Sequence, residues 1–509
     1  MASGVADGAL AETASFKDLA SKFYADEFRA SPITATRVGI HDYDAAVDDL
    51  SAAGYAAEIA RLHAALSTFQ QIDPATLSDS DRDDHEVLIS EIEGDLLDLE
   101  TIRYWRVDPW RYGSAATGAI YTLVHRDFAP PAERLRSVIA REKLIPALLA
   151  QGRANIEHPP KIFVEIASRN VAGSLAFFRT GVPAEFTGIA DPAVQAEFKT
   201  VNDQAIAALE SYRTWLDHDL LAKADGKFAL GTEVYARRLA LKEMVDTPPD
   251  RLLEIARAQL AKDRASLATA AHKIDPNASV EDVRKSIRSQ HPTAEALIPT
   301  ARDELAGLRQ FIVDHKLLTI PGDLLPKVEE TPGFMRATTA AAMDWPGPFE
   351  THATQAFYYV TPPDAGLSPE KLDDYLRAYD YSGFQIISAH EVWPGHFMQY
   401  LTRRAHPEWS EVRVLAHTQS TTEGWAHYTE QMVIEQGLGG GDPKLAVGQA
   451  EEALLRDCRF IASIEMHTRG MSVDDAAHLF MKECGSPEAE ARREAWRGTG
   501  DPGYLNYTV

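Results

Sequence analysis

The residues with the clearest chemical potential lie in the segment HEVWPGHFMQ, which begins at His390. His390 and His396 could each offer a neutral imidazole nitrogen to a metal ion. Glu391 could take a proton from a water molecule held on that ion. Two imidazole ligands with an adjacent carboxylate are what a zinc-dependent hydrolase requires. The segment therefore predicts a metal centre in which Glu391 is the general base.

The two histidines are six residues apart, whereas those of the common HExxH motif are four apart. An α-helix turns by about 100° per residue, so residues four apart differ by about 40° and residues six apart by about 120°. Both histidines can reach one ion only if the helix is interrupted between them. Pro394 removes a backbone hydrogen bond and Gly395 permits non-helical dihedrals, so we expect the helix to break at this pair.

A third ligand should come from another helix, and the segment TTEGWAHYTE, which begins at Thr421, supplies a candidate. Glu423, His427 and Glu430 share one face if this segment is helical. We expect Glu423 to complete a three-ligand site that leaves a fourth position open for water. His427 and Glu430 would then support the ligands from outside or contact the substrate.

These two blocks resemble the signature of a bacterial family called domain of unknown function 885, in which His-Glu-x-x-Pro-Gly-His precedes Glu-Gly-Trp-Ala. That family is similar to a distant branch of the gluzincin zinc metallopeptidases, which hold the metal with two histidines and a downstream glutamate. The resemblance implies that His390, His396 and Glu423 hold one zinc ion and that Glu391 acts as general base on a zinc-bound water.

The resemblance extends over about the C-terminal third of the chain, through TPGFMR, FYYV, the segment from Arg459 to His467 and the terminal block DPGYLNY. One departure is visible, because Ser463 stands where the family pattern has an acidic residue four positions after Arg459. In the resembling family the terminal block is followed by further chain, so we expect the natural protein to continue beyond Val509.

Attack on an amide carbonyl develops an oxyanion, which needs a hydrogen-bond donor in addition to the metal. Tyr507 is our first candidate for this donor, followed by Tyr504 and His467. Arg456 and Arg459 could bind a substrate carboxylate in bidentate fashion.

The elements that must position these residues are mostly helical, because apolar residues recur at three-to-four spacing along most of the chain. Examples are Phe16 to Phe28, Arg251 to Leu267 and Ala301 to Leu318. Ser368 and Ser486 are each followed by Pro-Glu, which predicts a capped helix start at both places. We expect a mainly α protein with a large helical body.

The exception is the segment 331–363, which is rich in turn formers and aromatic residues and contains the β-prone run FYYV at 357–360. We expect a short strand or hairpin here, near the active-site cleft. It would offer an edge to an extended substrate, and Tyr359 would be among the substrate contacts. We place a boundary near residue 320, between an N-terminal helical region (1–320) and a C-terminal catalytic region (321–509), or within one continuous two-lobed domain.

The amino-acid composition and net charge limit the kinds of partner that the protein could bind. The 509 residues are 45% hydrophobic and 25% charged, as in a folded protein, and carry 51 basic against 76 acidic side chains for a net charge of −25. That field repels phosphate backbones, so we expect no nucleic acid partner. No apolar run reaches the length of a membrane span, and two cysteines are too few for a disulfide framework.

The opening residues MASGVADGALAETASF lack the basic and apolar regions of a signal peptide. The sequence as it stands indicates a soluble, cytoplasmic protein, or a periplasmic or secreted one if an initiator Met has replaced a natural signal peptide.

The sequence favours a zinc-dependent hydrolase of metallopeptidase type that cleaves peptide or related amide bonds in short substrates. Manganese or cobalt would accept the same ligands. One alternative is a metal-dependent hydrolase of a non-peptide amide, ester or lactone with the same site. The other is a non-catalytic helical protein that binds a peptide or small ligand, in which the histidines form a buried polar patch at a kinked helix.

Overall fold

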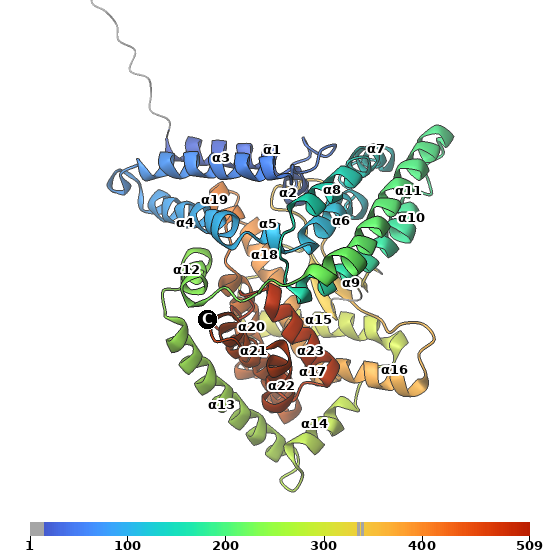
Figure 1. Ribbon diagram of the computed structural model, residues 1–509. Helices are drawn as coiled ribbons and strands as arrows, with labels where there is room; N and C mark the ends of the chain where they lie inside the picture. The colour runs from blue at the N-terminus through green and yellow to red at the C-terminus, as the bar shows by residue number, and fades with distance from the viewer. Residues whose placement is uncertain (1–14, 333–335, 337–339) are drawn as a thin grey trace, which may run out of the picture.

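The computed structural model describes residues 15–332, 336 and 340–509, and these are mainly helical with one small sheet (Figure 1). The predicted fold class is therefore confirmed. The first eleven helices are α1 (Phe16–Ala30), α2 (Pro32–Val38), α3 (Ala52–Gln70), α4 (Asp79–Leu96), α5 (Tyr104–Val107), α6 (Trp110–His125), α7 (Pro131–Glu142), α8 (Ile145–Asn155), α9 (Lys161–Ala176), α10 (Val182–Glu185) and α11 (Pro192–Thr214).

The remaining elements carry the proposed chemistry and its support. They are α12 (Thr232–Glu243), α13 (Pro249–Ile274), α14 (Val280–Arg288), α15 (Leu297–His315), β1 (Lys327–Glu330), β2 (Ala341–Asp344), β3 (Phe357–Val360), α16 (Pro369–Leu376), α17 (Tyr381–Glu391), α18 (His396–Arg404), α19 (Glu411–Leu415), α20 (Gln419–Glu435), α21 (Pro443–Thr468), α22 (Val473–Glu483) and α23 (Glu488–Gly500).

The helices pack around several apolar cores. In Figure 1, α6–α11 lie at the upper right and share one core, while α12 and α13 run down the left side, α14 lies at the bottom, and all three pack with α21–α23. The sheet packs with α15, α17 and α18 in a further core. The expected boundary near residue 320 does not coincide with a break in packing, because α12–α15 precede it in sequence but share cores with elements that follow it.

Helix punctuation follows the sequence signals in most places. Ser15 caps α1 by accepting a hydrogen bond from the backbone of Asp18, and Ser368 caps α16 as expected. The predicted helix from Ala301 ends earlier than expected, because Lys316 adopts a left-handed conformation. Ser486 is not a cap, since Pro487 occupies the cap position of α23.

The sheet has the order β1-β3-β2, with β3 parallel to β1 and antiparallel to β2. The predicted FYYV strand is present as β3, but it is the central strand. Both of its edges are paired, so the expectation that it offers an edge to substrate is wrong. Within the described residues, that role can fall only to an outer strand, and β2 is the outer strand beside α17.

Cys458 of α21 and Cys484, which follows α22, form a disulfide that joins the two helices. Sequence reasoning did not predict this bond, because two cysteines 26 positions apart carry no pairing signal by themselves.

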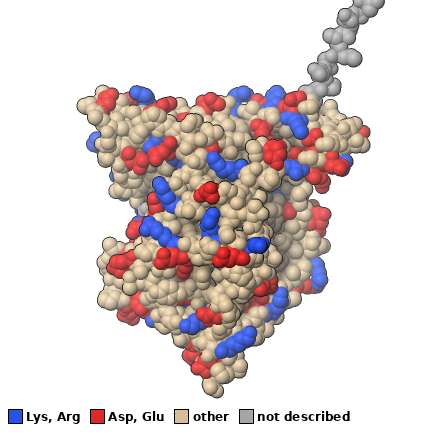
Figure 2. All heavy atoms as spheres, turned by 180° about the vertical axis from the view of Figure 1, so that it is seen from behind, with Lys and Arg blue, Asp and Glu red and all other residues tan. Residues whose placement is uncertain are grey.

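Charged side chains of both signs are interspersed over the face shown in Figure 2, so the net negative charge is not gathered into one acidic patch there. Among the helices in the described ranges, none is long and apolar enough to cross a membrane.

Candidate metal centre

The break between the two histidines occurs where the sequence predicts it. The helix α17 ends at Glu391, the peptide before Pro394 is cis, and α18 begins at His396. A Cβ atom on residue 395 would lie 1.6 Å from the carbonyl oxygen of His390, so this position accepts only glycine. The turn brings the imidazole rings of His390 and His396 to 4.8 Å between centroids, at 87° to each other.

Glu423 of α20 faces both rings. Its Oε2 lies 3.4 Å from Nε2 of His390 and 3.4 Å from Nε2 of His396. Ligand atoms that bind one zinc ion tetrahedrally, at about 2.0–2.1 Å from it, lie about 3.3–3.4 Å apart. The distances from Glu423 Oε2 to the two imidazole nitrogens therefore fit a single small cation.

The surroundings of Glu423 Oε2 also favour a cation at this position. The atom is buried, and no described residue gives it a hydrogen bond. Burial alone would raise the pKa of Glu423, but the imidazoles of His390 and His396 hold that pKa far below its usual range. A buried set of two imidazole nitrogens and one carboxylate oxygen at this spacing is a donor set that suits zinc.

Glu430 contacts the nitrogen of His390 that faces away from Glu423. Its fully buried carboxylate accepts a hydrogen bond from Nδ1 of His390 at 2.7 Å and one from Nδ1 of His427 at 3.1 Å. Arg456 lies 3.4 Å from the same carboxylate. Burial raises the pKa of Glu430, but Arg456 and His427 outweigh it and keep that pKa well below its usual range. A proton on Nδ1 of His390 leaves Nε2 to face the centre, as a metal ligand must.

The protonation state of His390 is linked to the binding of a metal ion. Burial lowers its pKa, but the carboxylates of Glu423 and Glu430 outweigh burial and raise the pKa to about 10. A metal ion that binds at neutral pH must therefore displace a proton from this ring.

Glu391 lies beside the two imidazoles. Ligand atoms of His390, Glu391 and His396 all fall within 4.8 Å of one another. Its Oε2 accepts a hydrogen bond from the backbone N–H of Met343 in β2 at 3.0 Å. The carboxylate is therefore held between the histidines and the outer edge of the sheet.

The comparisons with known proteins agree with the motif. A family described as "Bacterial protein of unknown function (DUF885)" matches residues 32–509. The chain belongs to this family. The DUF885 chain has no significant match among curated proteins.

Two solved structures resemble the DUF885 chain. A "putative lipoprotein of unknown function" from Shewanella oneidensis is 26% identical, with a TM-score of 0.80 over 97% of this chain and 91% of that chain. A "putative lipoprotein" from Colwellia psychrerythraea is 15% identical, with a TM-score of 0.79 over 97% of this chain and 91% of that chain. The second likeness shows the fold alone.

Tyr507 of the DUF885 chain lies at the centre, as expected. Its ring is nearly parallel to that of His390, at 21° and 6.1 Å between centroids. The terminal segment is held in place by Ser463, which donates a hydrogen bond to the carbonyl of Pro502 at 2.8 Å. A Cβ on Gly424 would make an ordinary van der Waals contact of 3.8 Å with the Tyr507 carbonyl, so this segment packs against α20 without requiring glycine there.

Three of the expected site residues are not at the centre. His467 is fully buried, donates a hydrogen bond to the Gly498 carbonyl at 2.8 Å and stacks on Tyr235 at 5.8 Å; burial lowers its pKa to about 4. Tyr504 is also buried in the core of α21–α23. Both side chains are buried in packing contacts.

Tyr359 points away from α17. It stacks on Phe357 at 5.5 Å and faces His125 of α6 at 6.4 Å, whereas its neighbour Tyr358 hydrogen-bonds Ser388 of α17. Alternation along β3 thus places Tyr359 on the opposite face of the sheet from the metal helix.

Arg456 and Arg459 are near the centre but already have partners. Arg459 makes a bidentate ion pair with Glu494 at 2.7 and 2.9 Å, and both side chains are buried. Arg456 pairs with Glu452 and Glu430. Neither guanidinium is free to bind a substrate carboxylate as expected. No sequence motif indicated Glu494, although a buried arginine requires such a partner.

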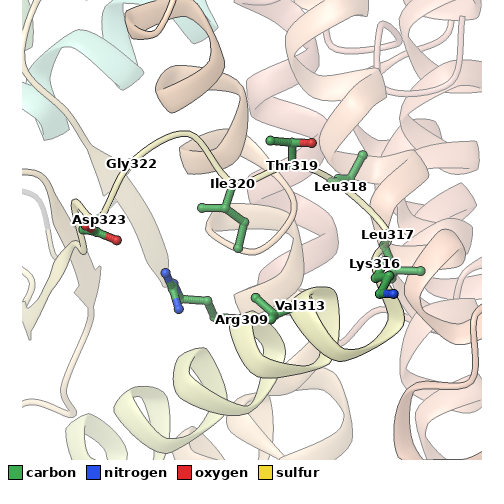
Figure 3. A pocket seen from close by; sticks show the side chains of 9 residues that line it. All are labelled: Arg309, Val313, Lys316, Leu317, Leu318, Thr319, Ile320, Gly322 and Asp323. Atoms are coloured by element: carbon green, nitrogen blue, oxygen red, sulfur yellow. The ribbon is translucent and has the colours of Figure 1, made fainter.

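A separate, open pocket of about 520 Å³ lies where α15 ends and the chain continues towards β1 (Figure 3). Arg309, Lys316 and Ile320 are among its lining residues, which include no residue of the metal centre. Its charged groups come from flexible side chains of both signs, so it gives no indication of a second reactive site.

Proposed function

We propose that this DUF885 protein is a zinc-dependent hydrolase of metallopeptidase type that cleaves amide bonds in short peptides. The observation that carries the proposal is the buried Oε2 of Glu423, which lies 3.4 Å from each of two imidazole nitrogens beside the carboxylate of Glu391. The order of these residues along the chain resembles that of the gluzincin metallopeptidases, which supports the same reading.

His390, His396 and Glu423 would hold the ion. When bound, a zinc ion acts as a Lewis acid that polarises a carbonyl oxygen and lowers the pKa of water at the site.

Glu391 would act as the base. Its carboxylate takes one proton from the attacking water as the water oxygen bonds to the amide carbon. It then gives that proton to the leaving nitrogen as the C–N bond breaks, so the products are a carboxylic acid and an amine. The hydrogen bond from Met343 fixes the orientation of the carboxylate for both transfers.

Tyr507 would supply a hydrogen bond to the oxyanion. Its ring stacks on that of His390, and Ser463 holds the terminal block through its hydrogen bond to the Pro502 carbonyl. An aromatic hydroxyl at such a place is a common donor to developing negative charge.

Strand β2 would position the substrate. Its pairing with β3 turns the N–H of Met343 outward, towards Glu391, so this edge and the base lie together. An extended peptide that adds to a sheet edge is held by main-chain hydrogen bonds, which place its backbone in a defined register.

The test has two parts. Metal analysis of the purified protein should find one zinc per chain, and a library of short peptides should be cleaved. The variant Glu391→Gln should keep the metal and lose about 10²- to 10⁴-fold in kcat. The variant His390→Ala should lose the metal, whereas His406→Ala, which changes a partly exposed histidine in contact with Glu408, should not.

Other outcomes would redirect the proposal. Zinc with cleavage of esters or lactones but not peptides would keep the site and change the substrate. A protein without a stoichiometric transition metal that still binds peptides would be a binding protein and not an enzyme.

We also propose that the protein acts outside the cytoplasm. Disulfides persist in oxidising compartments, and the Cys458–Cys484 bond lies in the core. The two similar solved structures are both described as "putative" lipoproteins. Fractionation of the native host would test this, and recovery only from the cytoplasm would contradict it.

A further inference from the structure

Three arginines surround the ring of Tyr507. The guanidinium carbons of Arg456, Arg459 and Arg497 lie 5.4, 5.0 and 5.9 Å from the ring centroid. They differ sharply in accessibility, because the side chains of Arg456 and Arg459 are 8% and 9% exposed and that of Arg497 is 39% exposed. Only Arg497, in the last turn of α23, can meet a molecule that enters from solvent.

Arg497 also has unused hydrogen-bonding capacity. Its Nε donates to Asp501 at 3.1 Å. Within the described residues, its two terminal nitrogens donate no hydrogen bond to protein. Those nitrogens are the pair that a guanidinium uses to bind a carboxylate in bidentate fashion.

The surroundings keep Arg497 charged. Burial by the neighbouring protein acts to lower its pKa, as does the charge of Arg459, but Tyr507, Asp501 and Glu494 outweigh them and raise it. Its charge is therefore presented to solvent beside Tyr507, whose ring stacks on that of His390.

The distances define which part of a substrate could reach it. Arg497 lies 5.9 Å from the Tyr507 ring, whose centroid is 6.1 Å from that of the ligand His390. A peptide advances by about 3.3–3.6 Å per residue. The guanidinium is thus within reach of a group one to three residues beyond a bond that is cleaved at the centre.

We propose that Arg497 binds the free C-terminal carboxylate of the substrate, so that this site acts on short peptides or N-acylated amino acids that end a few residues past the scissile amide. This inference rests on the proposed function and adds the substrate class. It also replaces Arg456 and Arg459, whose guanidinium groups are buried, whereas Arg497 is accessible and pairs with Asp501 through Nε alone. A dedicated cation offsets the repulsion that a chain of net charge −25 exerts on an anionic substrate.

Binding measurements test the inference without turnover. The Glu391→Gln protein is dialysed against a pool of N-acetylated di- and tripeptides, each present as the free acid and as the matched C-terminal amide, and bound peptides are quantified by mass spectrometry. Free acids should bind about 10- to 100-fold more tightly than their amides, as expected for a charge-assisted bidentate contact.

Substitution of Arg497 should remove this preference and nothing else. In the Glu391→Gln background, Arg497→Gln should bind acids as weakly as amides and leave the affinity for amides unchanged. Arg492→Gln changes an exposed arginine on the same helix, paired with Glu488 and Asp474, and should keep the preference. Asp501→Asn should also keep it, because it leaves the guanidinium in place.

Two results would overturn the inference. One is that free acids bind no more tightly than their matched amides, or that no free acid binds. The other is an unchanged preference in Arg497→Gln. Neither result bears on the proposed function, which depends on the metal content and on cleavage of peptides, amidated ones included.

Discussion

Glu430 accepts a hydrogen bond from Nδ1 of His390 at 2.7 Å, and the carboxylate that does so has no exposure to solvent. The bond joins α20 to α17 and sets the direction in which the imidazole presents its other nitrogen. Because Glu430 also binds His427 and lies against Arg456, its position is fixed from three sides.

We therefore expect Glu430→Gln to weaken metal binding by about 10- to 100-fold, as substitutions of carboxylates behind ligating histidines do. A glutamine would hold His390 less firmly and would remove the anion that favours proton donation from Nδ1. Competition with a chelator of known affinity measures the change. Glu435→Gln, an exposed position on the same helix, is the control, and equal metal affinities for the two variants would refute this role.

Gly395→Ala should abolish the metal centre. Its Cβ would lie 1.6 Å from the carbonyl oxygen of His390 and 2.7 Å from that of Ala389, and backbone atoms cannot move away as a flexible side chain can. Relief requires that the turn between α17 and α18 open, which would separate His390 from His396.

The readouts are metal content and thermal unfolding. We expect loss of stoichiometric metal together with a lower Tm. Gly307→Ala is a matched control, because nothing lies within 4 Å of a Cβ at that position of α15, and alanine should be neutral or stabilising by up to about 1 kcal/mol. A Gly395→Ala protein that retained full metal content would show that the turn is not restricted to glycine.

The candidate metal centre was the most predictable part of the molecule. Its residue types and spacing form short-range patterns with few other uses, carried by His390, Glu391, His396 and Glu423. Pro394-Gly395 indicated the helix break between the two histidines. Helices such as α1 and α13 were predictable from their apolar periodicity, and α1 also has a serine cap.

The residues that the sequence did not place correctly depend on long-range packing. The terminal block bears both Tyr507, which reaches the centre, and Tyr504, which fills a core, and no local pattern distinguishes them. The same holds for Arg459 and Arg497, since burial against Glu494 decides which one is accessible. The central position of β3 likewise depended on the pairing of β1 with it across the intervening segment.

Removal of the disulfide should destabilise the protein by about 3–4 kcal/mol, the chain-entropy value for a closed loop of this length. Cys458 and Cys484 are 26 positions apart, and the loop between them contains the end of α21 and all of α22. Denaturant unfolding of Cys458→Ser/Cys484→Ser measures the loss. A reducing agent should lower the stability of the wild type to that of the variant and leave the variant unchanged; an equal effect on both would contradict the expectation.

A buried acid should make stability depend on pH. Glu142 at the end of α7 is fully buried, and no described residue gives either of its oxygens a hydrogen bond. Burial raises its pKa from 4.5 to about 8. The folded state therefore holds a proton that the unfolded state has already lost between these pH values.

The sign follows from proton linkage. Because the folded pKa lies above the unfolded pKa, the contribution of Glu142 to stability is greatest below pH 4.5 and declines as the pH rises towards 8. The slope approaches about 1.4 kcal/mol per pH unit in the middle of this window.

Urea unfolding of the wild type and of Glu142→Gln across the window isolates the contribution, since glutamine does not titrate. The difference in unfolding free energy between the two proteins should change with pH, whereas Glu133→Gln, at the exposed start of the same helix, should follow the wild type. A difference that stays constant from pH 5 to pH 8 would show that Glu142 is ionised in the folded protein and has a partner that lowers its pKa.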